Sequence, residues 1–492
     1  MTYKAYINQQ LMIGVGIDFG TSNSAAAWYD GESVHLVQLE PDDIIMPTAT
    51  HLNRELATKT GQEAVFQYIE ENRDRIVELT PEIIGKSALL TAETATDDPH
   101  SEAEVATANV YGHSWIDRGM PGRLFRGIKR LLGNSSVKRL LVFSHPFRIV
   151  ALVTPILLHI RKTIEQYLPG PFEAVHFGHP VVFEGSEHHR NELAFARLTE
   201  ACMYAGIRNL SFYAEPVAAT LSYLNDVRAP SSGRVLTLDF GGGTLDLSVI
   251  EFDGIDFEVL STAGLSLGGD HIDQLIFSEL VFPLLGKGEI WSRVSDGKLI
   301  ETEFPFEDFE EKLLNWAVTY ILNQNQYRAK VADCIKNGGP AAVKFERLDD
   351  LISHNYSYLV FQAIKDAKAR LSDVEQTMLD IPELDIVIPF SRSQFESMMS
   401  SMLQQIDGIL VRVLGDADCS ANDIDVVIRT GGSSQIAAVK HKLEHWFPGR
   451  VTEHDPFTSV AAGLAIASYH GYKFDADAGI QEEPAAGSQL GS

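Results

Sequence analysis

Two segments of the sequence share one pattern of strand, acidic loop and strand, and 221 residues separate their matching aspartates, Asp18 and Asp239. The first reads IGVGIDFGTSNSAAAWYDGESVHLVQL and the second reads VLTLDFGGGTLDLSVIEFDGIDFEVLS. In each, an apolar run ends at an Asp, a Gly and Thr loop follows, and two further strand-like runs flank an Asp-Gly dipeptide. Asp-Gly between such runs is a strong signal of a hairpin turn. The repetition predicts two lobes built from one duplicated unit.

Helical and strand-like segments alternate between the two copies. Apolar periodicity predicts helices over about 148–167 and 186–206, followed by the strand-like runs VHFG at 175–178 and LSFYA at 210–214. Such alternation is typical of mixed α/β layers. The sequence therefore predicts an α/β fold.

The second half contains two long segments of helical periodicity, 309–336 and 342–372, which Gly338, Gly339 and Pro340 separate. Gly and Pro are the strongest local interruptions of a helix. We expect a mostly helical insertion over about 285–360.

The composition is that of a globular chain, with 45% hydrophobic and 22% charged residues among 492, enough for two or more cores. The 67 Asp and Glu outnumber the 40 Lys and Arg, and the net charge of -27 opposes binding to nucleic acid and to anionic lipid surfaces. We therefore expect no nucleic-acid partner and no membrane partner. A small anion such as a nucleotide can still be held by backbone donors, and the charge suggests that a divalent cation helps.

Three widely spaced cysteines, Cys202, Cys334 and Cys419, form no CxxC motif and no Cys/His cluster. This pattern indicates neither a disulfide framework nor a structural zinc site, and it favours a reducing, cytoplasmic location. The longest apolar stretch, 148–161, is too short to span a bilayer and predicts a buried helix. The acidic stretch over 474–492 has no apolar period and is typical of a disordered tail.

The repeated loops carry the chemistry. An Asp at the end of a buried strand, followed by Gly and Thr in a tight turn, places a carboxylate beside several backbone N–H groups. Such a loop can hold phosphate oxygens while the carboxylate holds hydrated Mg²⁺. Taken alone, the run from Asp18 to Thr21 is equally explained by a strand that ends in an ordinary turn. The matching run from Asp239 to Thr244 favours a pair of phosphate loops.

A third glycine loop, from Thr430 to Ser434, follows the apolar run IDVVIR and precedes a helix-like segment. Glycines in this position allow a nucleotide base or ribose to lie against bare backbone. An ordinary strand-to-helix turn explains this loop equally well.

The motifs GIDFGTSNS, LDFGGGTLDLSV, AEPVAATLSYL, LSLGGDHID and RTGGSSQI occur in the order used by the seventy-kilodalton heat-shock (DnaK-type) chaperones. The resemblance runs from about residue 12 to 470 and covers the ATPase domain of that family. It implies the fold of the actin, hexokinase and heat-shock ATPase superfamily, with two ribonuclease-H-like lobes, a nucleotide cleft between them and helical insertions. Lobe I would comprise 12–224 and 448–470, and lobe II would comprise 225–447.

The resemblance also implies that the chain binds ATP or ADP together with Mg²⁺. Asp18 and Asp239 would organise the metal through water molecules. The residues that the resemblance assigns to the nucleotide are Gly20, Thr21, Ser22, Asn23, Gly241, Gly242, Gly243, Thr244, Gly268, Gly269, Lys368, Ser372, Gly431, Gly432 and Ser433.

Lys129 matches the catalytic lysine of the family, whose ammonium neutralises charge on the γ-phosphate and positions the attacking water. Glu215 precedes Pro216, which favours a helix start, and the resemblance implies that this Glu contacts the water shell of the metal. The alternative interpretation of Lys129 is a solvated lysine on a basic helix face. Without the resemblance, an ordinary helix start explains Glu215 equally well. The expected catalytic residues are Lys129, Asp18, Asp239, Glu215 and Thr244.

The sequence departs from the family pattern at the base end of the expected site. Lys365 stands where the family usually has Glu, and Phe457 stands where it often has Asp. Ala369 and Gln435 replace two arginines whose guanidinium groups stack on adenine. We expect weaker and less selective adenine binding.

After residue 470 the sequence leaves no room for a peptide-binding β-sandwich of roughly 100 residues. In this respect the chain resembles the truncated YegD-like branch of the family. We expect an ATPase of the heat-shock chaperone type that lacks the peptide-binding domain. It would act as a molecular chaperone or nucleotide-driven switch through a protein partner or co-chaperone.

Two other functions fit the same fold, because a fold does not fix a function. Sugar kinases share the two phosphate loops, but they need an acidic base in a substrate pocket, and no candidate is as specific as Lys129. A non-hydrolysing nucleotide sensor or filament subunit is the other alternative, and the long insertion argues against a compact filament subunit.

Overall fold

A computed structural model describes residues 13–75, 77, 79–90, 105–117, 119–143, 145–168, 172, 174–184, 189–225, 230–254, 256–295 and 298–472 of the protein. The predicted tail over 474–492 lies outside these residues. The chain divides into two compact units. Unit 1 combines Met1–Glu70, Gly122–Leu284 and Tyr358–Ser492, and unit 2 combines Glu71–Pro121 and Leu285–Ser357. The boundaries predicted for the two lobes stay a prediction.

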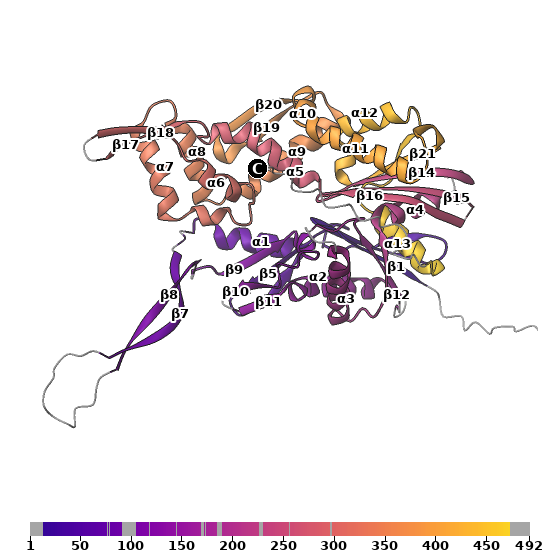
Figure 1. The fold of residues 1–492 in the computed structure, drawn as a ribbon, viewed down its shortest axis with the longest axis horizontal. Helices are drawn as coiled ribbons and strands as arrows, with labels where there is room; N and C mark the ends of the chain where they lie inside the picture. Colours follow the sequence, from indigo (N-terminus) through magenta and orange to yellow (C-terminus); the bar gives the residue numbers. More distant parts are fainter. Residues whose placement is uncertain are drawn as a thin grey trace, which may run out of the picture. The chain divides into compact units, whose positions relative to one another are not determined.

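Unit 1 contains two mixed sheets in which the strands have the same arrangement (Figure 1). In the first sheet, β1 pairs antiparallel with β2 and parallel with β12, which gives the order β13-β12-β1-β2-β3 with β4 beside β2. Its strands are β1 (Gly14–Phe19), β2 (Asn23–Tyr29), β3 (Val34–Leu36), β4 (Met46–Pro47), β12 (Ala174–His179) and β13 (Asn209–Ala214).

In the second sheet, β14 takes the place of β1. It pairs antiparallel with β15 and parallel with β21, and the order is β16-β15-β14-β21-β22. The strands are β14 (Ser232–Phe240), β15 (Leu245–Asp253), β16 (Asp256–Leu265), β21 (Val426–Thr430) and β22 (Val451–Glu453). The shared strand arrangement confirms the predicted α/β fold of two duplicated lobes.

The two predicted Asp-Gly turns lie at equivalent places in these sheets. Gly31 follows β2 with a φ of 99°, and Gly254 follows β15 with a φ of 63°. Both values lie in the left-handed region, which glycine adopts without the steric cost of a Cβ.

Three smaller sheets complete the strands of unit 1. One is three-stranded, in the order β6-β5-β9, and two are hairpins. The strands are β5 (Ala49–Asn53), β6 (Thr58–Thr60), β9 (Gly122–Arg126), β10 (Arg139–Val142), β11 (His145–Arg148), β19 (Gln376–Ile381) and β20 (Ile386–Ser391).

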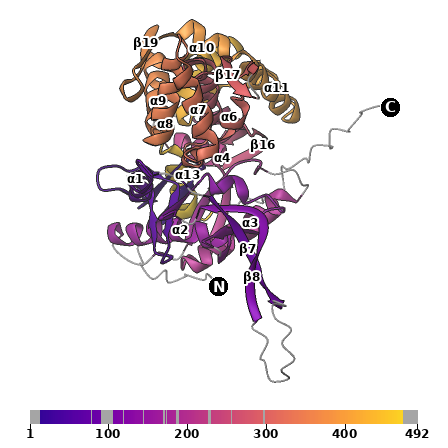
Figure 2. The ribbon, with the colours of Figure 1, turned by 90° about the vertical axis from the view of Figure 1, so that its left-hand side faces the viewer.

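Helices α2 (Ile149–Tyr167) and α3 (Arg190–Tyr204) confirm the two helices predicted between the copies (Figure 2). Leu152 and Leu198, one from each helix, are fully buried in one apolar cluster with Val15 and Ile17 of β1. The apolar stretch at 148–161 is thus a buried helix, as predicted. Among the described residues, no helix is long and apolar enough to cross a membrane. The other α-helices that lie in unit 1, wholly or mostly, are α1 (Gly61–Asn72), α4 (Glu215–Leu224), α5 (Gly269–Ile276), α9 (Ser357–Asp373), α10 (Arg392–Met398), α11 (Ser400–Asp416), α12 (Ala437–Trp446) and α13 (Ser459–His470).

Helix α13 is apolar around most of its circumference, and a helix of that kind is buried. It packs against β1 and α4 at distances that only glycine permits. A Cβ on Gly16 would lie 2.3 Å from the carbonyl oxygen of Ala461, and a Cβ on Gly463 would lie 1.7 Å from that of Ala218. The last described helix therefore completes the core around the first strand.

In the part of unit 2 that the structure describes, a long two-stranded ribbon is combined with three α-helices and a second hairpin (Figure 1). Phe304, Phe309 and Phe345 form part of its core, with ring centroids 4.8 and 5.3 Å apart around Phe304. Its elements are β7 (Leu79–Leu90), β8 (Val105–Asp117), β17 (Ile290–Ser295), β18 (Lys298–Glu303), α6 (Glu307–Leu313), α7 (Asn325–Asn337) and α8 (Ala342–Ser353).

The two long helical segments predicted in the second half are each interrupted. The segment 309–336 is broken between α6 and α7, where a single 3₁₀ turn covers Thr319–Leu322. The segment 342–372 is broken between α8 and α9 by Asn355, whose φ of 54° lies outside the helical region. The hairpin of β17 and β18 is a further difference from the mostly helical insertion that we expected.

Candidate active site

The first loop joins β1 to β2 and begins directly after the strand that carries Asp18. Asp18 is the penultimate residue of β1 and lies opposite Ala25 of β2. A Cβ on Gly20 would lie 2.2 Å from the carbonyl oxygen of Asn23, so only glycine fits this turn. The strand thus delivers the Asp18 carboxyl to the base of a tight turn.

The second loop joins β14 to β15 in the same way. Asp239 is the penultimate residue of β14 and lies opposite Asp246 of β15. The Gly241 N–H donates to the Thr244 carbonyl oxygen at 3.0 Å and closes the turn.

The two loops face each other. A Cβ on Gly242 would lie 2.8 Å from Ser22 Oγ, and a Cβ on Gly243 would lie 2.6 Å from Thr21 Oγ1. The bare backbone of the second loop therefore lies beside the hydroxyl side chains of the first. This contact brings together the two phosphate loops that the sequence predicts.

The third glycine loop lies beside the second. Gly431 has a φ of 80°, and a Cβ there would lie 2.5 Å from Asp239 Oδ1. Ser433 Oγ donates to the Gly241 carbonyl oxygen at 3.0 Å. The strand-to-helix turn after β21 thus borders the loop that follows β14.

Gly268 and Gly269, which precede and begin α5, also contact the second loop. The Gly269 N–H donates to the Gly241 carbonyl oxygen at 3.0 Å. A Cβ on Gly268 would lie 2.1 Å from the carbonyl oxygen of Gly242. Four glycine-containing segments therefore meet at one place in unit 1.

Lys129 lies in the 3₁₀ turn η1 (Ile128–Leu131), and its ammonium is buried. Nζ donates to Glu215 Oε1 at 2.5 Å, and the two side chains are 5% and 10% exposed. Burial lowers the pKa of Lys129, but the carboxylates of Glu215 and Asp18 outweigh burial and hold the pKa above its usual value. The ammonium is therefore charged, and its position is fixed by Glu215 at the start of α4.

Three aspartates lie close to this ion pair. Burial raises the pKa of Asp18 to about 7, and the Glu215 carboxylate adds to the rise while Lys129 opposes it. Burial and Glu215 likewise raise the pKa of Asp246 to about 7. Burial and Glu215 also raise the pKa of Asp239 well above its usual value. The single charge of the Lys129 ammonium therefore does not neutralise all of these carboxyl groups.

This donor set fits a divalent cation. Mg²⁺ prefers carboxylate oxygens and retains several of its water molecules. Among the described residues, no three His, Cys, Asp or Glu side chains converge to bind a metal ion directly. The resemblance implies that a cation beside Asp18 and Asp239 is held through water molecules.

A polar network that the sequence did not predict links the loops to α5. Ser22 Oγ donates to Asp270 Oδ2 at 3.0 Å, and Arg130 Nη2 donates to the same oxygen at 3.2 Å. Arg130 Nε also lies 3.2 Å from Glu184 Oε1. The partners are up to 248 positions apart, so no local pattern in the sequence could reveal the network.

Asp246 is a second residue that sequence reasoning did not single out. It is 1% exposed, and its Oδ1 accepts a hydrogen bond from the Val181 N–H at 2.8 Å. A signal was present, because Asp246 is the charged residue within the otherwise apolar run LDLSVI. A charged side chain in a buried strand is costly unless it is paired or functional.

Contacts bring together only some of the residues that the sequence predicts around the nucleotide base. Lys368 Nζ donates to Asp273 Oδ1 at 2.5 Å and lies 3.4 Å from the Gly269 carbonyl oxygen, which ties α9 to α5. Ser372 lies one turn further along α9, and its carbonyl oxygen accepts from Arg392. Burial, followed by repulsion from Arg126, lowers the pKa of Lys365.

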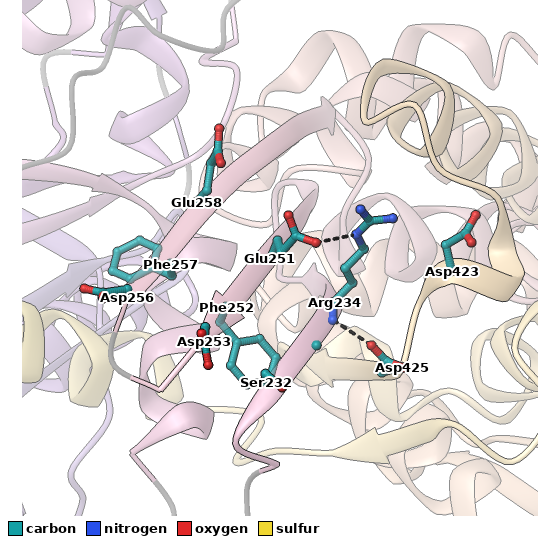
Figure 3. A pocket seen from close by; sticks show the side chains of 11 residues that line it. Ser232, Arg234, Glu251, Phe252, Asp253, Asp256, Phe257, Glu258, Asp423 and Asp425 are labelled. Carbon is teal, nitrogen blue, oxygen red and sulfur yellow. Dashed lines mark hydrogen bonds and ion pairs between the residues drawn. The ribbon is translucent and has the colours of Figure 1, made fainter.

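A pocket of about 740 Å³ lies at the other end of the second sheet and is separate from these loops (Figure 3). Ser232 begins β14 and Asp253 ends β15, whereas the second loop joins the opposite ends of these two strands. Arg234 in this pocket pairs with Glu251 at 3.0 Å. The pocket contains none of the predicted site residues.

Comparison with known proteins identifies the family. A model of the Hsp70 protein family matches residues 138–290 and 344–469, which is more than half of the chain. The chain is also similar to the chaperone protein DnaK of Thermotoga neapolitana, with 24% identity over 464 residues. This match covers 92% of the chain but 58% of the relative, so the chain spans less than two thirds of the relative's length. These matches confirm the resemblance seen in the motifs, and the chain belongs to the Hsp70 family.

Proposed function

We propose that this chain is a Mg²⁺-dependent ATPase of the heat-shock chaperone type, which binds ATP and ADP at the two facing loops. One observation carries the proposal. A buried Lys129–Glu215 ion pair lies beside the Asp18 and Asp239 carboxyls, each at the base of a glycine loop. A structural role alone does not account for this set, because buried charges are costly and no local pairing neutralises all of them.

The loops would hold the phosphate groups. Backbone N–H groups in a glycine turn form a concave donor surface for anions, and Gly242 and Gly243 leave that surface uncovered. Thr21 and Ser22 of the first loop border the same place. Each loop contributes one side of the phosphate site, so both are needed to surround the phosphate chain.

Asp18 and Asp239 would hold the cation through water molecules. When bound, Mg²⁺ neutralises phosphate charge and orients the phosphate oxygens. The raised pKa of Asp18 and Asp239 supports this assignment, because a cation restores the charge balance that burial and Glu215 disturb.

Lys129 would act on the transferred phosphate. Its ammonium is held by Glu215 at 2.5 Å and stays charged, so it can stabilise negative charge on the phosphate and position a water molecule for attack. Thr244 ends the second loop and would orient the same phosphate group. Positioning and electrostatic stabilisation suffice for this chemistry, without a covalent intermediate.

The nucleotide state would be read by a protein partner or co-chaperone, which has to recognise a surface that differs between bound states. We place the protein in the cytoplasm. Support comes from Cys202, Cys334 and Cys419, which are free thiols, two of them buried, as is usual in a reducing compartment.

Turnover of the purified chain tests the proposal. We expect phosphate release from ATP that requires Mg²⁺ and needs no acceptor. ADP formation that depends on a sugar from a panel of sugars would instead show a kinase. Nucleotide binding without any turnover would show a sensor.

A further inference from the structure

Phe457 lies beside the third glycine loop, and its aromatic ring is exposed to solvent. The side chain is 56% exposed, and in the described part of the chain its ring stacks on no other ring. Single exposed apolar residues are common on protein surfaces and by themselves indicate nothing. Two features of the surrounding structure set Phe457 apart.

The first feature is that the backbone of Phe457 is rigidly held. Asp455 Oδ1 accepts hydrogen bonds from the N–H groups of Phe457 and Thr458, both at 3.0 Å. The Asp455 carbonyl oxygen in turn accepts from Thr430 Oγ1 at 3.0 Å, which anchors the turn to the end of β21. The backbone that carries the ring is thus held in place before any ligand arrives, so less backbone entropy is lost on contact.

The second feature is the neighbour of the ring. A Cβ on Gly432 would lie 3.0 Å from Phe457 Cε1, so the ring lies beside the bare backbone of the third loop. The next residue, Ser433, donates to the Gly241 carbonyl oxygen of the second phosphate loop. The backbone of Gly432 and Ser433 therefore lies between the second loop, where the phosphates of a ligand would bind, and the Phe457 ring.

The chain also lacks the base-stacking arginines that the resemblance implies near the nucleotide base. The resemblance places stacking arginines at the positions of Ala369 and Gln435, and neither side chain carries a planar cation. Phe457 stands at a position where the family often has Asp. The resemblance therefore assigns Phe457, Ala369 and Gln435 to the same end of the site.

We propose that Phe457 is the base-stacking residue of this chain, and that the planar base of a purine nucleotide lies against its ring. The inference rests on the proposed nucleotide site and names how the base is held there. Aromatic side chains stack on every base, because each base has a π face. Phe457 therefore confers affinity for the base with little selectivity between adenine and guanine.

Binding of Mg-ADP to purified variants, measured by calorimetry, tests the proposal. We expect Phe457→Ala to weaken ADP binding by about tenfold, in line with stacking of one base on one aromatic side chain. Phe457→Leu, which keeps an apolar side chain without a π face, should be nearly as weak. Phe457→Tyr should bind as the parent does. Binding of Mg-tripolyphosphate, which has no base, should be equal in all four proteins.

Phe66 on α1 provides the matched control, because it is 52% exposed and Phe66→Ala removes the same side chain elsewhere in unit 1. It should leave ADP affinity unchanged. The proposal is overturned if the parent binds ADP and Phe457→Ala binds it equally well, or if Phe457→Ala weakens tripolyphosphate binding by the same factor. A parent that binds neither ADP nor tripolyphosphate would instead overturn the nucleotide site itself, and this inference with it.

Discussion

The two phosphate loops occupy equivalent places in two sheets of one design, yet they are built differently. The first has Thr21 and Ser22 where the second has Gly242 and Gly243. The hydroxyl side chains of the first loop lie beside the uncovered backbone of the second, at distances that any added Cβ would violate. Two copies of either loop could not meet in this way, because side chains would collide or glycines would leave a gap.

The strands that carry the loops also differ. Asp18 lies opposite Ala25, whereas Asp239 lies opposite Asp246. The second strand pair therefore contributes two buried carboxyl groups, whereas the first contributes one that is only partly buried. The two copies turn at equivalent places, but they carry different numbers of carboxyl groups beside the turn. If that inequality extends to function, changes in the two loops will have unequal effects.

The largest expected effect is on turnover in Lys129→Ala. The single-turnover rate of ATP hydrolysis should fall about 100- to 1000-fold with little change in ADP affinity, because the ammonium acts mainly on the transition state. Lys368→Ala is the matched control, since it also removes an ammonium that contacts a buried carboxylate at 2.5 Å, that of Asp273. It should weaken ADP binding and leave the rate at saturating ATP near that of the parent. Equal hydrolysis rates in Lys129→Ala and the parent would make Lys129 a structural residue.

A smaller effect is expected when each loop aspartate is changed alone. Asp18→Asn and Asp239→Asn should each weaken Mg-ADP binding by about 10- to 100-fold, the range typical of altered groups around a bound metal. In EDTA, both variants and the parent should bind ADP with similar affinity, because the carboxyls act through the cation. Calorimetry in which only Asp239→Asn has an effect would show that the first loop has lost this role.

The extra carboxyl of the second strand pair should be visible in stability. The folded state keeps protons on Asp18 and Asp246 up to about pH 7, whereas an unfolded aspartate releases its proton near pH 3.8. Stability that depends on these protons is complete below pH 3.8 and is lost as the pH rises through about 7. Asp246→Asn removes one such group, so its free energy of unfolding relative to the parent should rise by about 4 kcal/mol between pH 4 and pH 8.

Urea unfolding without nucleotide, in EDTA, measures this difference. Asp253→Asn, an exposed change at the end of the same strand, is the control and should show no such pH-dependent gain. A constant difference between Asp246→Asn and the parent across this pH range would contradict the prediction.

The smallest effect concerns the base, which we propose to lie beyond both loops. With Ala369 and Gln435 in place of two stacking cations, each worth roughly 0.5 to 2 kcal/mol, GTP should compete with ATP to within about tenfold. Competition of both nucleotides for a fluorescent ADP measures the ratio. Nanomolar ATP affinity with complete rejection of GTP would refute this prediction.

The sequence was most informative where local patterns decide the structure. The Asp-Gly dipeptides and apolar runs predicted the antiparallel strands of both sheets, and Glu215-Pro216 predicted the start of α4. It was least informative where a single backbone angle or a distant partner decides. Nothing near Asn355 predicts its positive φ, and nothing near Ser22 predicts a bond to Asp270.

For the candidate site, the sequence predicted which loops bind phosphate, but it did not predict how these loops contact each other. The contact of Gly243 with Thr21 depends on two segments that are far apart in the chain. Asp246 could have been found, because a lone carboxylate in an apolar strand indicates an unusual environment. The Arg130 network could not, since arginine and aspartate are ordinary surface residues when seen singly.

The glycine contacts between α13 and β1 have a consequence for how the protein is made. The ribosome produces α13 some 440 positions after β1. Until α13 emerges, Gly16 of β1 lacks its contact with Ala461, and Ala25 and Ala27 of β2 lack the apolar side chains of α13 that help to bury them. Long-range contacts of this kind slow folding and expose sticky intermediates. We expect nascent chains that stop before Ser459 to need protection from aggregation, although both phosphate loops are already synthesised.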